Sequence, residues 1–472
     1  MLLKLELSMV KNNGIKIFKL SCISSSLLFL LSCSSTPTTD IQSELVSPTQ
    51  WQSVLTKYQD TSPLLSDNIQ SDKLKALIND ALVNNLELRS QALNLQKAEI
   101  NLKRAGMALW PDLDFKVDAS RGNRNGISNS FSLGLTTSYN LDIWGKLSDA
   151  EKAAQLGYQK AEIAFLQTKN NIVSQVANAW FDLVAAENFY KLYEQRTLNV
   201  KNNLDIIEQG YQAGLNKALD VYLTRSDYEK EQSRLISQQQ QIENASRKLS
   251  LLIGGYPDKS ITSDFLFKQV KVSVPKGVPA EVIKARPDIQ LSWLDVLIDD
   301  AELAIAHKNR FPKFEIRASI SDEESKVSNL LKDGLWSLAA GITLPILDSR
   351  NLKSAEETAQ LEFQQSELAY LKTTYEAFHE VETTLTQIDV LDRQKKHAVS
   401  QKENAVIAEK LAFEQYLNGL VTYATVLTAQ NRTLDAEIQL LELNKNLVVN
   451  QISLHLALGK NWQSIAGTEI NE

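Results

Sequence analysis

The sequence predicts a mixed α and β membrane protein, in which long helices join four strands and one structural unit occurs twice. Three observations predict this class. Glycine and proline are scarce, at 17 and 10 in 472 residues, and such a composition favours long helices. Four segments alternate apolar and polar residues with a period of two, which is typical of strands with unlike faces. Motifs also recur about 205 residues apart, which indicates an internal duplication.

Residues 1–32 have the pattern of a signal peptide. Four lysines precede an apolar stretch, 20–31, that is too short to span a bilayer. The stretch ends in Leu30-Leu31-Ser32-Cys33, which resembles the signal of bacterial lipoproteins, in which the Cys is lipidated and becomes the first residue. We therefore expect lipidation of Cys33, while an ordinary signal peptide with an incidental Cys is the alternative. Residues 33–71 would form a tether that begins rich in Ser, Thr and Pro.

Composition argues against several functional classes. The net charge is −7, so we expect no nucleic-acid partner. Two Cys and four His lack metal-ligand spacing, and we expect neither a metal nor another cofactor. His379 and Glu382 have a spacing that could bind a metal, but a lone His among helix charges is more often solvated. Because no catalytic elbow, phosphate loop or dinucleotide motif occurs, we do not expect an enzyme.

The duplication divides the chain into segments. Tyr211-x-x-Gly214-Leu215 recurs as Tyr416-x-x-Gly419-Leu420. We predict the following segments: repeat 1 at 72–255, an equatorial linker at 256–280, repeat 2 at 281–461 and a C-terminal tail at 462–472.

Each repeat contains two predicted strands, about 113–121 and 131–141 in the first and about 314–321 and 335–346 in the second. Each has an apolar and a polar face and is long enough to cross an outer membrane when tilted. Four strands cannot close a barrel, and lipid tolerates no open edge. Within a membrane the protein must therefore be an oligomer. The alternative is a pair of soluble hairpins, each with one face on a core.

The remaining sequence of each repeat is helical. The longest predicted helices are 147–212 and 352–415, each about 100 Å long. Leu166, Val173 and Trp180 recur at intervals of seven, which is typical of a coiled-coil seam. In the first repeat, shorter helices over 72–108 and 217–252 would flank the long one.

The motifs together resemble those of the TolC-like outer-membrane efflux proteins, and the signal ending in Cys33 is similar to that of their lipoprotein branch, of NodT type. The motifs are Pro111 and Pro312 before the first strand of each repeat, Leu141-Asp142-Ile143-Trp144-Gly145, Arg286-Pro287-Asp288-Ile289 and the two Tyr-x-x-Gly-Leu sequences. The chain departs at Asp348-Ser349-Arg350, where the family often has Gly after the Asp. The resemblance implies a trimer whose 12-stranded β-barrel continues into a long periplasmic α-helical coiled-coil barrel.

The same resemblance implies the function. The chain would be the outer-membrane channel of a tripartite efflux system for drugs, toxic compounds or metal ions, coupled through a periplasmic adaptor to an inner-membrane pump of the RND type. It would be lipid-anchored and barrel-inserted, in contact with outer-membrane lipid, with most of its mass in the periplasm. A conduit for type I protein secretion is the alternative. A periplasmic coiled-coil scaffold would explain the helices but not the strands.

Two sets of residues are candidate sites. Gly214, Leu215, Gly419 and Leu420 follow the long helices, and Gly is suited to leaving a helix in a left-handed turn. By resemblance, these helical tips contact the adaptor; alternatively, each Gly is only a cap.

The second set, Glu376, Glu380 and Glu382, is assigned to the lower half of the second long helix, where the family's tunnel narrows. Threefold symmetry would convert an inward carboxylate into a ring that attracts cations. Glu376 and Glu380 share a helix face and Glu382 points elsewhere. We favour Glu380 and Glu382 for this periplasmic gate, and solvated surface charges are the alternative.

Overall fold

The computed structural model describes residues 45, 48, 51, 71–123, 127–263, 279, 285–327, 334–346 and 348–459. Every described helix and strand belongs to one unit, Ser47–Glu472. Cys33, the predicted signal peptide and the predicted tail lie outside the described residues.

The helices of the first repeat are α3 (Asp72–Asn84), α4 (Leu86–Met107), α5 (Lys146–Gln212) and α6 (Ala218–Leu252). Those of the second are α8 (Pro287–Lys308), α9 (Ser349–Leu417) and α10 (Tyr423–Ala457). With 67 and 69 residues, α5 and α9 are each about 100 Å long. None of the helices in the described part of the chain combines the length and apolar character needed to cross a membrane.

The single helix predicted over 72–108 is wrong in one respect, because it breaks at Asn85. This residue has an extended backbone, with φ −60° and ψ 128°. Its Oδ1 accepts hydrogen bonds from the amides of Glu87 and Leu88, which caps the start of α4. Its Nδ2 donates to the carbonyl of Leu252 at 2.7 Å. The side chain therefore caps one helix and fixes the break against the end of α6.

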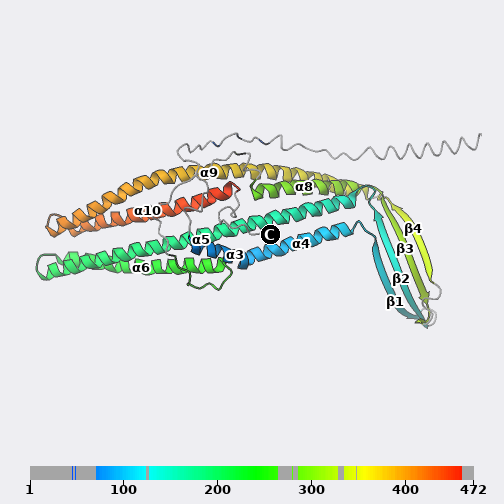
Figure 1. The fold of residues 1–472 in the computed structure, drawn as a ribbon, viewed down its shortest axis with the longest axis horizontal. Helices are drawn as coiled ribbons and strands as arrows, with labels where there is room; N and C mark the ends of the chain where they lie inside the picture. Colours follow the sequence, from blue (N-terminus) through cyan, green and yellow to red (C-terminus); the bar gives the residue numbers. More distant parts are fainter. Residues whose placement is uncertain are drawn as a thin grey trace, which may run out of the picture. The chain divides into compact units, whose positions relative to one another are not determined.

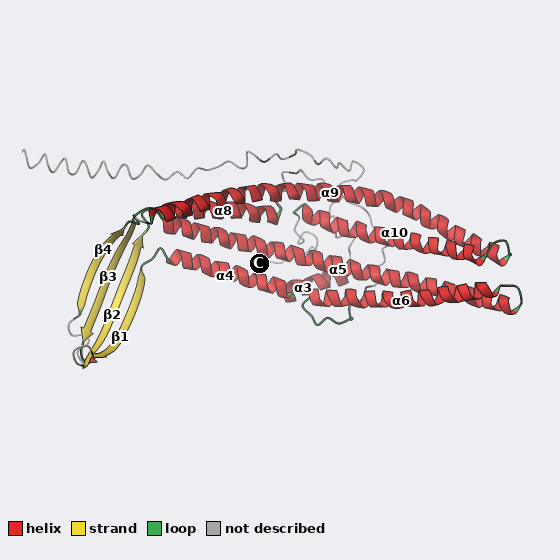
Figure 2. Ribbon diagram, turned by 180° about the vertical axis from the view of Figure 1, so that it is seen from behind, coloured by secondary structure: helices red, strands yellow, loops and turns green. Residues whose placement is uncertain are grey.

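Four antiparallel strands form one sheet in the order β1-β2-β3-β4 (Figures 1 and 2). They are β1 (Asp112–Asn123), β2 (Ile127–Leu141), β3 (Lys313–Glu324) and β4 (Leu335–Thr343). The two repeats meet in the sheet, where β2 pairs with β3. Strand β4 ends before Pro345, which has no amide hydrogen to donate to a neighbouring strand.

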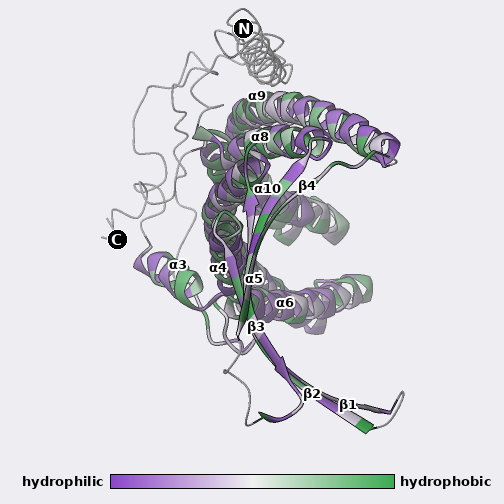
Figure 3. Cartoon of the chain, turned by 90° about the vertical axis from the view of Figure 1, so that its right-hand side faces the viewer, coloured by the Kyte–Doolittle hydropathy of each residue, from purple (hydrophilic) through white to green (hydrophobic). Residues whose placement is uncertain are grey.

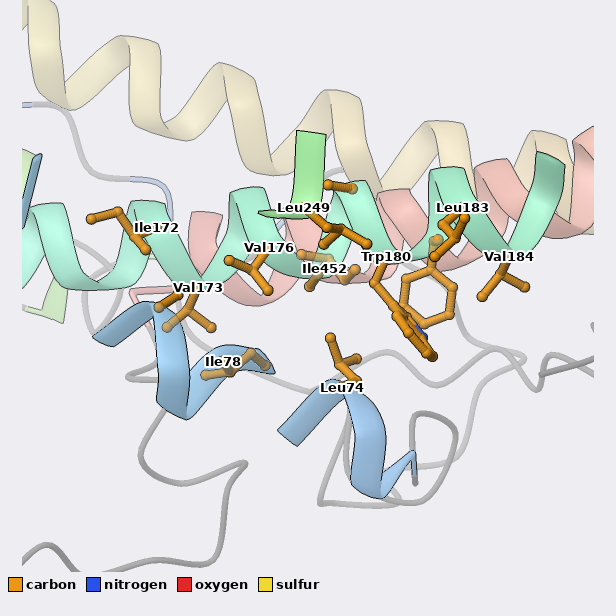
Figure 4. Packing of buried hydrophobic residues seen from close by; sticks show 14 of the residues in the cluster. Leu74, Ile78, Ile172, Val173, Val176, Trp180, Leu183, Val184, Leu249 and Ile452 are labelled. Atoms are coloured by element: carbon orange, nitrogen blue, oxygen red, sulfur yellow. The ribbon is translucent and has the colours of Figure 1, made fainter. Parts of the chain in front are cut away.

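The helices next to the sheet pack side by side in the order α4-α5-α8-α9 (Figure 1). Towards the opposite end, α6 pairs with α5, α10 pairs with α9, and α5 contacts α10 (Figure 2). The largest core cluster lies along the middle of α5 (Figure 4). There Val173 and Trp180 of the predicted heptad are 1% exposed and pack with residues of α3, α6 and α10.

Candidate functional site

By its register the sheet has one apolar and one polar face. Figure 3 shows how hydropathy varies along the strands. The strand register aligns an apolar row across all four strands: Phe115, Leu135, Ile320 and Trp336. The adjacent row on the opposite face is polar: Asp114, Thr136, Ser319 and Ser337. Trp336 is 78% exposed and Phe115 66%. Such an exposed apolar surface backed by a polar one is the arrangement of a membrane barrel with a water-filled interior.

The motif Leu141-Asp142-Ile143-Trp144-Gly145 joins the sheet to the helices. The carboxylate of Asp142 accepts hydrogen bonds from the amides of Leu147 and Ser148 and caps α5. Trp144 Nε1 donates to the carbonyl of Pro312 at 2.8 Å. This bond ties the end of β2 in repeat 1 to the start of β3 in repeat 2.

Glu356, in the first turns of α9, adds an ionic contact near this junction. It pairs with His307 Nδ1 at 2.6 Å and with Arg310. Burial raises the pKa of Glu356, but hydrogen bonds from His307 and Arg310 and the charge of Arg310 outweigh it and lower this pKa below 4.5.

Arg286, in the motif that opens repeat 2, lies at the middle of the long helices and is 8% exposed. Its guanidinium donates two hydrogen bonds to Asp288, at 3.0 and 2.7 Å, and one to the carbonyl of Ala457 at 2.9 Å. It also pairs with Glu380 at 2.7 Å. Burial lowers the pKa of Arg286, but the bonds and charges of Asp288 and Glu380 outweigh it and raise the pKa overall. One side chain thus joins the start of α8 to α9 and to the end of α10.

The predicted acidic residues lie in a different part of α9 from the part we expected. Glu376, Glu380 and Glu382 are near the midpoint of this helix, not in its lower half. The predicted helix, 352–415, has its own midpoint near residue 383, so its bounds already contradicted an assignment to the lower half. Glu380 pairs with Arg286, and Glu376 pairs with Lys372 at 3.8 Å. Glu382 is half-buried.

The two tip turns have the same geometry. Gly214 and Gly419 have φ of 77° and 71°, a left-handed conformation that favours glycine. In each turn the next residue's amide donates to a carbonyl five residues earlier: Leu215 to Gly210 and Leu420 to Gln415. The side chains of Leu215 and Leu420 are 82% and 73% exposed. Each turn therefore presents one apolar side chain at the end of a helical hairpin.

A hydrogen bond ties the two hairpins together near their tips. Tyr416 Oη on α9 donates to Asp220 Oδ2 on α6 at 3.2 Å. Burial, together with the negative charge of Asp220, raises the pKa of Tyr416 well above 10. Around this bond, apolar residues from α5, α6, α9 and α10 form one cluster. Tyr416 belongs to the repeated Tyr-x-x-Gly-Leu motif, but the motif does not indicate which residue its hydroxyl group contacts.

Sequence reasoning also missed a buried cation between the hairpins. Arg196 on α5 is 6% exposed and lies 3.6 Å from Asp227 on α6 and 3.8 Å from Glu409 on α9. It lines a cavity of about 460 Å³. Its partners are 31 and 213 positions away in sequence, so no local motif could have identified the contact.

His379, the residue weighed as a metal ligand, is exposed on α9. Within the ranges that the structure describes, no group of three or more His, Cys, Asp or Glu side chains is placed to hold a metal ion.

Comparisons with known proteins agree with this geometry. The family model described as "Outer membrane efflux protein" matches residues 77–255 and 278–460. The cation efflux system protein CusC of Escherichia coli O6:H1 is 29% identical over 402 residues, which cover 83% of this chain and 87% of CusC. The pyoverdine export outer membrane protein OpmQ of Pseudomonas aeruginosa is 26% identical, with 94% and 97% covered.

A solved structure extends the likeness to three dimensions. One crystal structure of CusC comes from work on its folding and transmembrane channel formation. Its superposition on this chain has a TM-score of 0.79, with 26% of the residues identical, and covers 91% of this chain and 100% of the CusC chain. The predicted fold class, a trimeric channel with four strands per protomer and long helices, is confirmed. The predicted location in the outer membrane, with most of the helical mass in the periplasm, is also confirmed. The chain belongs to the outer membrane efflux protein family and is the outer-membrane channel component of an efflux system.

Proposed function

We propose that three copies of this chain form a conduit that a periplasmic adaptor couples to an inner-membrane pump of the RND type. The observation that carries the proposal is the sheet, whose faces are apolar and polar. Its strands β2 and β4 are each followed by a helix about 100 Å long. Such a protomer is suited to surround water within lipid and to extend that water-filled path into the periplasm. The conduit would guide its cargo without catalytic chemistry of its own.

The cargo we propose is small molecules or metal ions. Support comes from relatives named for cation efflux and for pyoverdine export. The test uses a strain that lacks the native gene. Restored efflux of small compounds together with stepwise ion conductance in planar bilayers is expected. A protein that conducts no ions would overturn the conduit, and recovery of a secreted protein without small-molecule efflux would favour type I secretion.

We propose that the adaptor binds at the two tip turns. The exposed Leu215 and Leu420 and the matched left-handed turns support this assignment. Leu215→Glu and Leu420→Glu should each reduce efflux while heat-resistant trimers persist. Leu198→Glu is the matched control, because Leu198 is 58% exposed on α5 but lies 16 residues before Gly214. Equal efflux in all three variants would refute the contact.

We propose that Cys33 carries the lipid. Its position after the apolar stretch 20–31 supports this assignment. Cys33→Ala should abolish labelling by a palmitate analogue, whereas Cys22→Ala, which changes a residue within the predicted signal, should leave it unchanged. Labelling that persists in Cys33→Ala would contradict the assignment.

We retain the acidic ring as a proposal at the middle of α9. Glu376, Glu380 and Glu382 repeated by threefold symmetry would favour cations in the tunnel. Since Glu380 also pairs with Arg286, its effect on permeation must be separated from its effect on stability. Single-channel recordings of Glu380→Gln and Glu382→Gln should show weaker cation preference and weaker block by multivalent cations. Unchanged selectivity, conductance and block in both variants would disprove the ring.

A further inference from the structure

The cavity beside Arg196 has the size and the lining of a small-molecule site. It has a volume of about 460 Å³ and is lined by residues of α5, α9 and α10. Cavities of about 300–1,000 Å³ are typical of sites that hold a drug-sized molecule. Arg196 lies about 24 Å before Gln212, the last residue of α5, at 1.5 Å per residue. The cavity is therefore separate from the tip turns.

Two buried side chains of the wall have polar atoms without a described partner. Arg196 is 6% exposed and Gln430, on α10, is 2% exposed. Among the described residues, Nε and Nη2 of Arg196 find no hydrogen-bond acceptor, and Oε1 of Gln430 finds no donor. The carboxylates of Asp227 and Glu409 lie 3.6 and 3.8 Å from the guanidinium, beyond hydrogen-bond distance. The wall is therefore suited to a molecule that supplies both an acceptor and a donor.

The charges of the wall favour a neutral molecule. Arg196 already lies between two carboxylates, those of Asp227 and Glu409, which would repel an added anion at short range. The guanidinium would repel an added cation in the same way. The other two charged side chains of the wall each have a partner of opposite charge: Glu437 pairs with Lys402, and Lys410 pairs with Glu414.

Apolar side chains complete the lining. Leu192 of α5, Phe413 of α9 and Leu434 of α10 each contribute to the wall. A ligand with an aromatic body can bury apolar area against these side chains and pack its ring against Phe413. A primary carboxamide adds a carbonyl acceptor and N–H donors without adding charge. An aromatic carboxamide therefore matches the lining in charge, polarity and hydrogen bonding.

We propose that this cavity binds a small neutral carboxamide with an aromatic body. Its carbonyl oxygen accepts from Nε and Nη2 of Arg196, and its N–H donates to Oε1 of Gln430. Because Arg196 is on α5 and Gln430 on α10, the bound molecule joins the two hairpins. The site goes beyond the conduit, since binding requires no transport.

Three probes with the same naphthalene body test the site by isothermal titration calorimetry on the purified trimer. Naphthamide has the carbonyl and the N–H groups, acetylnaphthalene has only the carbonyl, and naphthoate is an anion. Naphthamide should bind about tenfold more tightly than acetylnaphthalene, because the ketone leaves Oε1 of Gln430 without a donor. Naphthoate should also bind more weakly than naphthamide. Equal affinities for the three probes, or no binding of naphthamide, would overturn the proposal and leave solvent as the partner of these polar atoms.

A substitution at Gln430 tests the partner of the amide. Gln430→Leu removes Oε1 and keeps a buried side chain of similar size, so it should abolish the preference for naphthamide over acetylnaphthalene. Gln439→Leu is the matched control, because Gln439 is exposed on the same helix and is not part of the wall. It should keep the tenfold preference. A preference that persists in Gln430→Leu would refute the assignment.

A second variant keeps the proposal testable if Gln430→Leu fails to assemble. Leu192→Trp enlarges a half-buried side chain of the wall and should prevent the binding of naphthamide, and unchanged affinity would overturn the proposal. Bilayer conductance is recorded on the same samples. Trimers that bind naphthamide but conduct no ions would retain the site and reject the conduit. Trimers that conduct ions but bind no naphthamide would retain the conduit and reject the site.

Discussion

Arg286→Met should destabilise the protomer more than the loss of any surface ion pair. The substitution keeps an apolar side chain of similar length and removes a guanidinium that is 8% exposed. It leaves the carbonyl of Ala457 without its donor and removes the bonds to Asp288 and Glu380. The contacts with Ala457 and Glu380 join α8 to other helices, whereas Asp288 lies two positions further along the start of α8 itself.

The magnitude follows from the exposure of each partner. A buried carbonyl left without a donor costs about 1–3 kcal/mol. The ion pair with Glu380 contributes about as much as an ion pair on the protein surface, about 0.2–1 kcal/mol, because the Glu380 side chain is 49% exposed. Removal of the buried charge also relieves part of its desolvation penalty. We therefore expect a loss of about 1–4 kcal/mol in the free energy of unfolding.

The assay is thermal unfolding of the purified trimer in detergent, followed by circular dichroism. Arg393→Met is the matched control, since Arg393 pairs with Asp389 on the surface of α9 and is 64% exposed. The control should cost about 0.3–0.5 kcal/mol. Arg286→Lys should fall between the two, because an ammonium group cannot reproduce the planar fork of a guanidinium. If Arg286→Met unfolds at the same temperature as Arg393→Met, this account of the equatorial contact is wrong.

Three further predictions concern the tips and the junction. Tyr416→Phe should weaken the tie between the hairpins by about 1.5–3 kcal/mol and raise channel conductance in bilayers. Tyr211→Phe, its counterpart in repeat 1, should leave conductance unchanged. Gly419→Ala should lower the free energy of unfolding by about 1–2 kcal/mol. The loss should come from backbone strain alone, because no atom lies within 4 Å of an added Cβ. Thermal unfolding that matches that of the unsubstituted protein would contradict this. The pKa of Glu356 is lowered below 4.5 in the folded state, so its contribution to stability should be complete above pH 4.5 and decline as the pH falls below that value. Glu356→Gln should remove that part of the acid sensitivity in melts recorded over a pH series.

Local sequence patterns predicted the long elements well, for identifiable reasons. Helix α5 begins one residue before the predicted start and ends at the predicted residue, because glycines at 145 and 214 bracket a run without proline. The strands were predicted from the alternation of apolar and polar residues alone, since one face of the sheet is apolar and the other polar. The break at Asn85 was missed, because its fixed position depends on the carbonyl of Leu252, 167 residues away.

The candidate site was less predictable, since its contacts join distant segments. Tyr416 and Asp220 are 196 residues apart, and Arg196 meets acids from two other helices. A heptad pattern identifies a packing face but not the height at which a second segment crosses it. The position of the acidic residues along α9 needed no distant contact, because the predicted bounds, 352–415, already place them near the midpoint; their assignment to the lower half was wrong on those bounds.

The contacts between the repeats differ in strength along the protomer. At the sheet, β2 pairs with β3 over eleven residue pairs, and at mid-height the buried Arg286 joins three helices. Nearer the tips, the described polar contacts between the hairpins are the 3.8 Å ion pair of Arg196 with Glu409 and, beside a small apolar cluster, one hydrogen bond of 3.2 Å from Tyr416 to Asp220. Because Asp220 is charged, that bond is worth only about 1.5–3 kcal/mol, which is within the binding energy that one well-packed partner side chain supplies. If a partner binds the exposed leucines of the tip turns, we therefore expect the α9/α10 hairpin to loosen from the α5/α6 hairpin at the tips before the contacts at the equator or in the sheet break.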